Sequence, residues 1–173
     1  MNVSINWFKN NALNLSFDYN NSYANSSFFN AVLKNGNLTV GDSWKCGIRL
    51  YDGIAYSDWV NSTNLTILDI TSPSITLNSP ENNTNTSLTN INFNFTTTDE
   101  TSTSLNCSLY IDNTFKNNNA TTLNNTATIL NASALTEGSH NWTINCSDAS
   151  LNSNTSTRSF YVDTLKPNLT ISY

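Results

Sequence analysis

The stretch Leu105-Asn106-Cys107-Ser108-Leu109-Tyr110-Ile111 alternates apolar and polar side chains, which is the period of a half-buried β-strand. The same alternation occurs in Ile91-Asn92-Phe93-Asn94-Phe95-Thr96 and in Trp142-Thr143-Ile144-Asn145-Cys146-Ser147, and no window of the sequence shows a sustained helical stripe. Further short strands are expected at residues 75–77, 126–130 and 159–163. Strands that follow one another at roughly 8 to 15 residues between turn-rich breaks are typical of an antiparallel sandwich, so the sequence predicts an all-β fold.

One motif occurs twice in the chain. Asp69-Ile70-Thr71-Ser72-Pro73-Ser74-Ile75-Thr76-Leu77 returns as Asp163-Thr164-Leu165-Lys166-Pro167-Asn168-Leu169-Thr170-Ile171, a shift of 94 residues (163 minus 69). A fixed period of this length indicates an array of modules joined by short linkers that contain proline. We therefore expect an incomplete module at 1–68, a linker at 69–73, a sandwich module at 74–163, and at 164–173 the start of a further module or an exchangeable strand.

The composition argues against several classes of protein. The 173 residues are 38% hydrophobic with 8 Phe, 7 Tyr and 4 Trp, enough for modest cores, but only 11% are charged and the net charge is −5. Asn, Ser and Thr replace the missing charges and give a neutral surface that forms hydrogen bonds. The 7 scattered Lys and Arg do not form the basic footprint that nucleic acid requires. No segment approaches the roughly 20 apolar residues of a membrane span, so we expect no nucleic-acid partner and no membrane span in this chain.

The three cysteines divide into a pair and a remainder. Cys107 and Cys146 both fall on the apolar phase of their predicted strands and could face each other in the core. A bridge between them would close a loop of 39 residues (146 minus 107), worth roughly 3 to 4 kcal/mol in the chain-entropy model, so we predict this disulfide; the alternative is two buried thiols. A zinc site is disfavoured, because Cys-x-x-Cys spacing is absent and the chain has 1 His. Cys46 is left as an unpaired thiol.

The first module resembles an immunoglobulin-like domain that has lost its beginning. Trp7 followed by Phe8-Lys9-Asn10-Asn11 looks like the tryptophan-bearing third strand of such a domain. Gly41-Asp42-Ser43-Trp44-Lys45-Cys46 is similar to the sixth strand, in which an aromatic residue stands two places before the second cysteine. The first two strands, including the one that normally carries the partner cysteine, are missing.

The second module resembles the immunoglobulin-like repeats of large prokaryotic, especially archaeal, cell-surface and adhesin-type proteins. The stretches that carry this resemblance are Ile75-Thr76-Leu77-Asn78-Ser79-Pro80, Cys107-Ser108-Leu109-Tyr110-Ile111-Asp112, Leu135-Thr136-Glu137-Gly138-Ser139-His140-Asn141-Trp142, Cys146-Ser147-Asp148 and Phe160-Tyr161-Val162-Asp163-Thr164. The two resemblances imply tandem immunoglobulin-like β-sandwiches, the first lacking its initial strands, in a cell-surface setting. They transfer no binding site, because such repeats serve several functions.

Asn-x-Ser/Thr triplets, the acceptors of N-linked glycans, occur about 18 times, roughly twice the number that chance would give. Residues i and i+2 share one face of a strand, so a polar outer face made of Asn, Ser and Thr also generates this triplet without glycans. If the protein is secreted, triplets in or beside turns are the favoured glycosylation candidates: Asn61, Asn82, Asn119, Asn124 and Asn154.

For the other candidate functional residues, an ordinary structural role is an alternative to a functional one. His140 follows Gly138 at the start of a predicted strand, where a structural hydrogen bond is favoured, because no Ser–His–Asp or Cys–His set can be assembled around it. Tyr56 and Trp59 could stack on sugars, although a core or hairpin role is favoured. We expect no cofactor; loop carboxylates could gather around calcium, with solvated acids as the ordinary alternative: Asp99, Glu100 and Asp148.

These features predict a non-enzymatic extracellular module, a spacer or adhesion unit of a repetitive secreted surface protein. Its expected partners are neighbouring modules or identical subunits, and glycans or other surface proteins. The alternative is a subunit of an extracellular filament assembled by donor-strand exchange. A module without its first strands would expose apolar residues around Trp7 and Trp44, and a tail strand of another subunit could cover them through Leu169, Ile171 and Tyr173.

Overall fold

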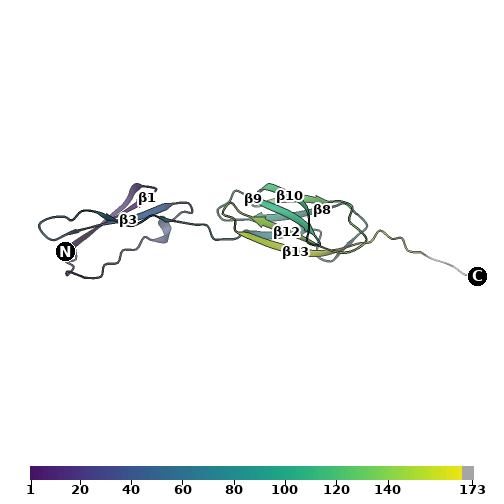
Figure 1. Ribbon diagram of the computed structural model, residues 1–173. Coiled ribbons are helices and arrows are strands. Elements are labelled where there is room, and N and C mark those ends of the chain that lie inside the picture. Colours follow the sequence, from purple (N-terminus) through teal and green to yellow (C-terminus); the bar gives the residue numbers. More distant parts are fainter. Residues whose placement is uncertain (169–173) are drawn as a thin grey trace, which may run out of the picture. The chain divides into compact units, whose positions relative to one another are not determined.

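The computed structural model describes residues 1–168, while residues 169–173 lie outside the description. The all-β prediction is confirmed, and the chain divides between Asp69 and Ile70 into two compact units (Figure 1). We call residues 1–69 unit 1 and the residues from Ile70 onward unit 2. Within the described residues the helical structure is one 3-10 turn, η1 (Asn35–Asn37), and no helix is long and apolar enough to cross a membrane.

Unit 2 consists of two sheets that share one core. The five-stranded sheet has the order β10-β9-β12-β13-β7 and the three-stranded sheet the order β11-β8-β6. All neighbours are antiparallel except β13 and β7, which are parallel. The strands are β6 (Ser74–Ser79), β7 (Thr84–Thr86), β8 (Ile91–Thr98), β9 (Ser104–Ile111), β10 (Thr114–Leu123), β11 (Thr126–Ala132), β12 (Gly138–Ser147) and β13 (Ser153–Val162).

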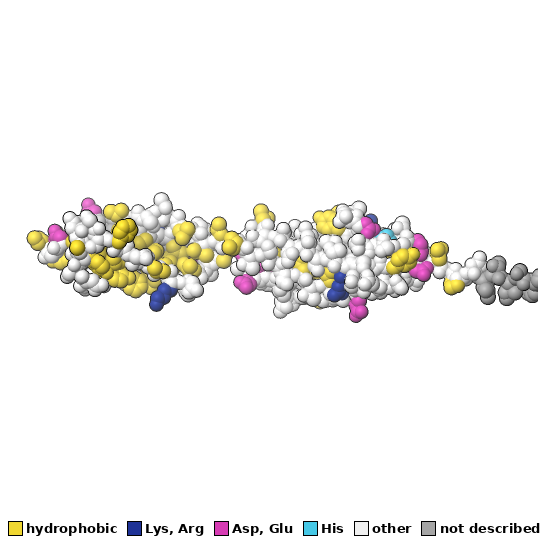
Figure 2. Space-filling model, turned by 90° about the horizontal axis from the view of Figure 1, so that it is seen from below, with side chains coloured by type: hydrophobic (Ala, Val, Ile, Leu, Met, Phe, Trp, Pro, Cys, Tyr) yellow, Lys and Arg dark blue, Asp and Glu magenta, His cyan; other side chains and the backbone are white. Residues whose placement is uncertain are grey.

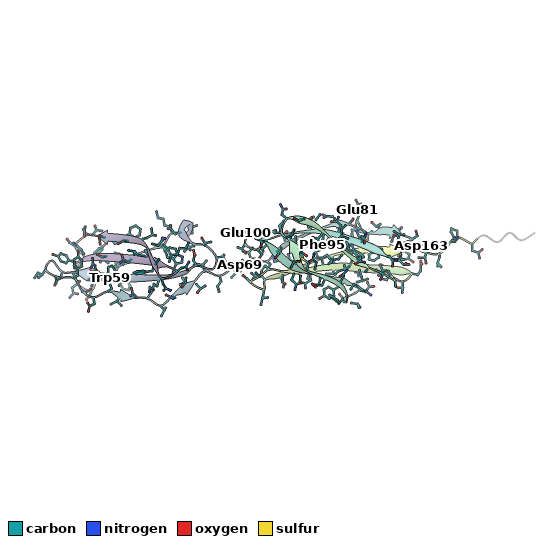
Figure 3. The ribbon with its side chains drawn as sticks, turned by 90° about the horizontal axis from the view of Figure 1, so that it is seen from above. Trp59, Asp69, Glu81, Phe95, Glu100 and Asp163 are labelled. Atoms are coloured by element: carbon teal, nitrogen blue, oxygen red, sulfur yellow. A yellow bond between two sulfur atoms is a disulfide. The ribbon has the colours of Figure 1, made fainter. Side chains whose placement is uncertain are left out.

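The core of unit 2 is formed by the alternating side chains that both sheets point inward. Phe93 and Phe95 of β8 are fully buried, and the ring of Phe93 lies 5.1 Å from Trp142 and 5.7 Å from Phe160, both on the opposite sheet. Phe95 lies inside this unit, whereas Glu81 lies at its surface (Figure 3). The period-two pattern therefore places the apolar residues between the sheets, which is a β-sandwich arrangement.

The predicted disulfide is present in this core. Cys107 and Cys146 are bonded, with their Cα atoms 4.1 Å apart, and both side chains are fully buried. The two residues are direct partners across β9 and β12, so the bridge joins neighbouring strands of one sheet. Cys46 is a free thiol in unit 1.

Unit 1 contains a single sheet. Its order is β2-β1-β3-β4, and β5 pairs with another part of β3. The strands are β1 (Asn2–Lys9), β2 (Ala12–Tyr19), β3 (Ser43–Tyr51), β4 (Val60–Asn61) and β5 (Leu65–Thr66). β2 is an addition to the strands expected from the sequence, although Leu13, Leu15 and Phe17 alternate there. Residues 20–42 form no strand.

The strand order β2-β1-β3-β4 of unit 1 matches β10-β9-β12-β13 of unit 2, and the turn of the first hairpin also matches. The β1–β2 hairpin turns at Asn10 and Asn11, with φ of 50° and 69°, and the β9–β10 hairpin turns at Asp112 and Asn113, with φ of 49° and 63°. Two-residue turns of this kind suit the twist of a hairpin, and Asn and Asp tolerate the left-handed conformation. In both units the next strand in space, β3 or β12, pairs with the first strand of the hairpin. The described residues of unit 1 form no counterpart of the three-stranded sheet.

The pairing of β1 with β3 can be compared, residue by residue, with the pairing of β9 with β12, and this comparison places Cys46. Counted from the hairpin turn, Cys46 stands opposite Trp7 and takes the place of Ile144 in unit 2. Ile5 and Ile48 are the pair that stands where Cys107 and Cys146 form their bridge. Cys46 is therefore not in the position of the bridged cysteine of unit 2.

Candidate functional site

The candidate site is one face of the unit 1 sheet, which we call the apolar face. Side chains directly opposite one another in a ladder point to the same side, so the register defines the face. Its residues are Val3, Ile5 and Trp7 on β1, Leu15, Phe17 and Tyr19 on β2, and Trp44, Cys46, Ile48 and Leu50 on β3. In unit 2 the corresponding face is covered by the three-stranded sheet.

Residues 20–42 cover the apolar face only in part. Phe29 of this segment packs against Tyr19, with ring centroids 5.1 Å apart. A hollow of about 420 Å³ remains between the segment and β3, and another of about 240 Å³ lies beside Met1. The larger hollow is lined mainly by apolar side chains, among them Trp7, Leu33, Leu38, Trp44, Cys46 and Leu65.

Many hydrophobic side chains of unit 1 stay exposed to solvent, so the cover that residues 20–42 provide is incomplete. Among the described residues 1–69, the buried hydrophobic side chains are Val3, Ile5 and Trp44, whereas Phe17 is 44% exposed and Leu65 66% exposed. Figure 2 shows hydrophobic side chains gathered on the surface of unit 1, while most of the visible surface of unit 2 is polar. Large contiguous apolar patches on a soluble protein mark interaction surfaces.

The free edge of β2 adds backbone groups to the same surface. β2 pairs with β1 on one side only among the described residues. The corresponding strand of unit 2, β10, is linked to β11 by a hydrogen bond from Asn117 Nδ2 to Asn131 Oδ1 of 2.6 Å. An open edge with an apolar face beside it favours the addition of another strand.

The β3–β4 hairpin covers part of the opposite face of the unit 1 sheet, around Arg49 and Gly47. The guanidinium carbon of Arg49 lies 4.0 Å from the ring centroid of Tyr56 and 4.8 Å from that of Trp59. A Cβ atom at Gly47 would lie 2.5 Å from Asn61 Oδ1 and 3.4 Å from Trp59, so this glycine allows the hairpin to approach. Tyr56 and Trp59 thus hold Arg49, in the hairpin role that the sequence favoured over sugar stacking.

His140 is held by two acceptors. Nδ1 lies 2.6 Å from Asp112 Oδ2 and Nε2 lies 2.8 Å from the carbonyl oxygen of Thr136, while the ring stacks on Phe160. Because a carbonyl and a carboxylate both accept, these contacts favour the imidazolium, the form in which both ring nitrogens carry protons. Burial lowers the pKa of His140, but the hydrogen bonds to Asp112 and Thr136 and the charge of Asp112 together raise it above its ordinary value. Both ring nitrogens are thus engaged by acceptors within unit 2.

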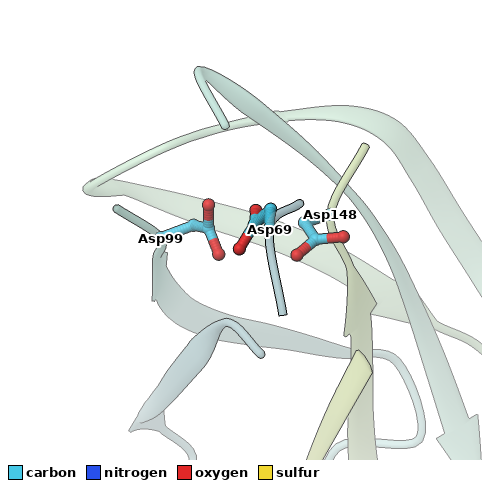
Figure 4. A group of neighbouring side chains, drawn as sticks. All are labelled: Asp69, Asp99 and Asp148. Atoms are coloured by element: carbon cyan, nitrogen blue, oxygen red, sulfur yellow. The ribbon is translucent and has the colours of Figure 1, made fainter. Parts of the chain in front are cut away.

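Three carboxylates lie together at the end of unit 2 where the linker enters. Oxygens of Asp69, Asp99 and Asp148 all lie within 4.8 Å of one another (Figure 4). Asp99 Oδ1 accepts bonds from the N–H groups of Thr101 and Ser102, and both oxygens of Asp148 accept bonds from Asn152. The structure thus brings together two of the three acids named from the sequence, whereas Glu100 is exposed and outside the group. A group of acids does not by itself define a metal site, and calcium binding stays a prediction.

The glycosylation candidates differ in how their side-chain amides are used. Asn124 donates from Nδ2 to the carbonyls of Asp99 and Ser102, at 2.7 and 2.8 Å, and accepts the Asp99 N–H at 3.0 Å. The Nδ2 of Asn154 donates to the Pro73 carbonyl at 3.0 Å. The remaining three are found at the end of β4, before β7 and within β10, respectively: Asn61, Asn82 and Asn119. At Asn124 the atom that would carry a glycan, Nδ2, therefore uses both of its N–H groups in hydrogen bonds within the fold.

The donor-strand residues Leu169, Ile171 and Tyr173 lie outside the described residues. No family model matches this chain, and no curated protein matches it.

Proposed function

We propose that this chain is a non-enzymatic extracellular structural module, built from tandem immunoglobulin-like units of a repetitive surface protein. The observation that carries the proposal is the agreement between the sequence repeat and the folded unit. The first copy of the repeated motif enters unit 2 and continues into β6, and the second copy begins at Asp163, directly after β13. One period of the sequence therefore equals one sandwich, as in proteins made of serial modules.

The surface chemistry of unit 2 supports an exposed setting. Amide side chains form ladders on its outer faces, such as Asn118 Nδ2 to Asn106 Oδ1 at 2.7 Å and Asn78 Nδ2 to Asn94 Oδ1 at 2.9 Å. Such ladders stabilise the sheet without charge. The Cys107–Cys146 disulfide fits an oxidising compartment, because bridges of this kind are rare in reducing cytosol.

The environment of His140 supports a role without catalysis. A general base needs a nitrogen that can reach the proton it removes. Both nitrogens of His140 are engaged by Asp112 and Thr136, and the residue is only 8% exposed. In this proposal the His140–Asp112 pair stabilises the fold.

Labelling of intact cells tests the proposal. Antibodies raised against unit 2 should label unpermeabilised cells of the source organism, and brief protease treatment of these cells should remove the signal. A cytosolic protein of the same cells, labelled only after permeabilisation, serves as the control. Labelling that appears only after permeabilisation would contradict the proposed location.

A further inference from the structure

We propose that Arg49, held against the rings of Tyr56 and Trp59, binds the carboxylate group of an acidic sugar. These three residues form what we call the Arg49 site, on the face of the unit 1 sheet opposite the apolar face. The inference assigns a ligand and goes beyond the role as a structural module. It rests on residues of unit 1 alone.

The two rings orient the guanidinium of Arg49. Its central carbon lies 4.0 Å from the ring centroid of Tyr56 and 4.8 Å from that of Trp59. A separation of 4.0 Å is that of carbon atoms in contact, so the guanidinium lies flat on the Tyr56 ring and its N–H groups are directed along its own plane. The rings therefore fix the direction of these donors without accepting hydrogen bonds from them.

The guanidinium has unpaired donors. Arg49 Nε is buried and has no hydrogen-bond partner among the described residues. The ion pairs of the described chain join Lys9 to Asp42 and His140 to Asp112, so no carboxylate there neutralises Arg49. A guanidinium binds a carboxylate through two parallel N–H···O bonds when its plane is fixed. Arg49 is thus an oriented, partly exposed cation without an anionic partner in the described chain.

The loop that carries the two rings is fixed by its own contacts. The Ser57 N–H donates to the Leu50 carbonyl at 2.9 Å, and the Leu50 N–H donates to Ser57 Oγ at 3.0 Å. The ring of Tyr56 also packs on that of Tyr51, with centroids 4.7 Å apart. Because the site is already ordered, a ligand does not have to immobilise it, and this lowers the entropic cost of binding.

The charge of the site favours a carboxylate over a phosphate. Lys45 is the other cation on this face of β3, and its ammonium lies 5.1 Å from the ring centroid of Phe8. Lys45 precedes Arg49 by four residues, which is about 13 Å along a strand. A phosphate monoester carries close to two negative charges at neutral pH, and Arg49 alone would neutralise only part of them. A carboxylate carries a single charge, which matches the guanidinium.

The position of Arg49 in the sheet favours a sugar over a peptide. Extended peptides bind by adding a strand to a free sheet edge. Arg49 lies on β3, which has β1 on one side and β4 and β5 on the other, so no free edge adjoins it. Beside it, Tyr56 is 56% exposed and Trp59, labelled in Figure 3, is 36% exposed. Aromatic side chains around a placed charge suit a compact ligand with an apolar ring face, such as a uronic acid.

Titration of the intact chain with sodium glucuronate at constant ionic strength tests the proposal. Nitrogen-15 NMR spectra should show saturable shifts of the Arg49 Nε–H signal and of the Trp59 indole N–H signal, which Trp59→Phe assigns. We expect a dissociation constant on the order of 1 mM, as for a ligand held through one charged contact. Glucose has the same ring without the carboxylate and should leave both signals in place.

Variants separate the site from general electrostatic attraction. Arg49→Gln should abolish the saturable shift of Trp59. Arg49→Lys keeps the charge and the contact with the rings but loses the two-point geometry, so binding should weaken by about fivefold or more. Lys45→Gln removes the same charge from the same strand and is the matched control, with affinity expected within about twofold of the unaltered chain. The remaining unit 1 signals show whether each variant is folded.

Three outcomes would overturn the proposal. The first is that glucuronate causes no saturable shift in the unaltered chain, which is independent of any folding defect in a variant. The second is that acetate or glutamate binds at Arg49 as tightly as glucuronate, which would make it an adventitious ion only or a peptide site. The third is an equal loss of binding in Lys45→Gln. None of these outcomes bears on the cell-surface proposal, and failure of the labelling test would leave this one standing.

Discussion

Trp44 and Trp142 occupy the same position in two matching frameworks. Each stands opposite the last residue before a two-residue hairpin turn, Trp44 opposite Lys9 and Trp142 opposite Ile111. Both are almost fully buried, but by different neighbours. Phe93 of the other sheet lies 5.1 Å from Trp142, whereas the Lys9 ammonium lies 5.8 Å from Trp44 over its ring. The same position thus packs across a sandwich in unit 2. In unit 1 its surroundings include Lys9 of the same sheet and, from the segment 20–42, Leu33 and Leu38, which line the hollow beside Trp44.

Because unit 1 lacks a covering sheet, its segment 20–42 should open more readily than any part of unit 2. Lys34 is exposed within this segment, so limited digestion with trypsin should cut first after Lys34. In unit 2, by contrast, Lys116 lies within β10 and Arg158 lies within β13. Mass spectrometry of the first fragments checks the site. A first cut at Lys116 or Arg158 would mean that unit 2 opens more readily than the segment 20–42.

Removal of the disulfide should destabilise unit 2 and leave it folded at low temperature. The double variant Cys107→Ala/Cys146→Ala opens a loop of 39 residues, so the free energy of unfolding should fall by about 3 to 4 kcal/mol. Denaturant unfolding followed by circular dichroism measures this change. Cys46→Ala is the matched control and should leave the unfolding of unit 2 unchanged, since Cys46 has no bridge.

Unit 2 should lose stability as the pH rises through the pKa of His140. This pKa is raised in the folded state, so folded protein binds the proton more tightly and the stabilisation is fully present below about pH 6.5. Burial raises the pKa of Asp112, but the Asn141 N–H, the bond to His140 and nearby charges hold it below its usual value. The contribution of Asp112 is therefore present above about pH 3.9 and is lost as the pH falls through its folded pKa.

The measurement is the free energy of unfolding of the intact chain at pH 5.5 and 8.5. Unaltered protein should be more stable at pH 5.5, and His140→Gln should remove most of this difference. An equal difference in His140→Gln would show that the pH dependence comes from other groups.

Asn124→Ala should destabilise unit 2 more than the same substitution at an exposed asparagine. The Asn124 side chain bridges the Asp99 and Ser102 backbone through three hydrogen bonds, and its loss should cost about 2 kcal/mol. Asn85→Ala, at an exposed position of β7, is the control and should change the stability by less than about 0.5 kcal/mol. Thermal unfolding of both variants checks the comparison. Similar losses would mean that the bridge contributes little.

Much of the fold could be predicted because strand alternation is a local property. The phase of Cys107 and Cys146 in their own strands placed both in the core before any partner strand was known. Sequence reasoning missed β2, although its alternation of Leu13, Leu15 and Phe17 was a usable signal. β10 was missed for a different reason, since Asn117, Asn118 and Asn119 interrupt any apolar pattern there, and pairing with β9 forms the strand.

The sequence by itself determined the β-class, the repeat period and the inward phase of the bridged cysteines, because each depends on residues a few positions apart or on a literal repetition. Only the tertiary structure decided which strands are neighbours. It placed Cys46 opposite Trp7, His140 beside Asp112, and Trp44 in the position of Trp142. It also left the apolar face of unit 1 without a second sheet. Long-range pairing is chosen by the burial that the whole unit achieves, so no local pattern in the chain specifies it.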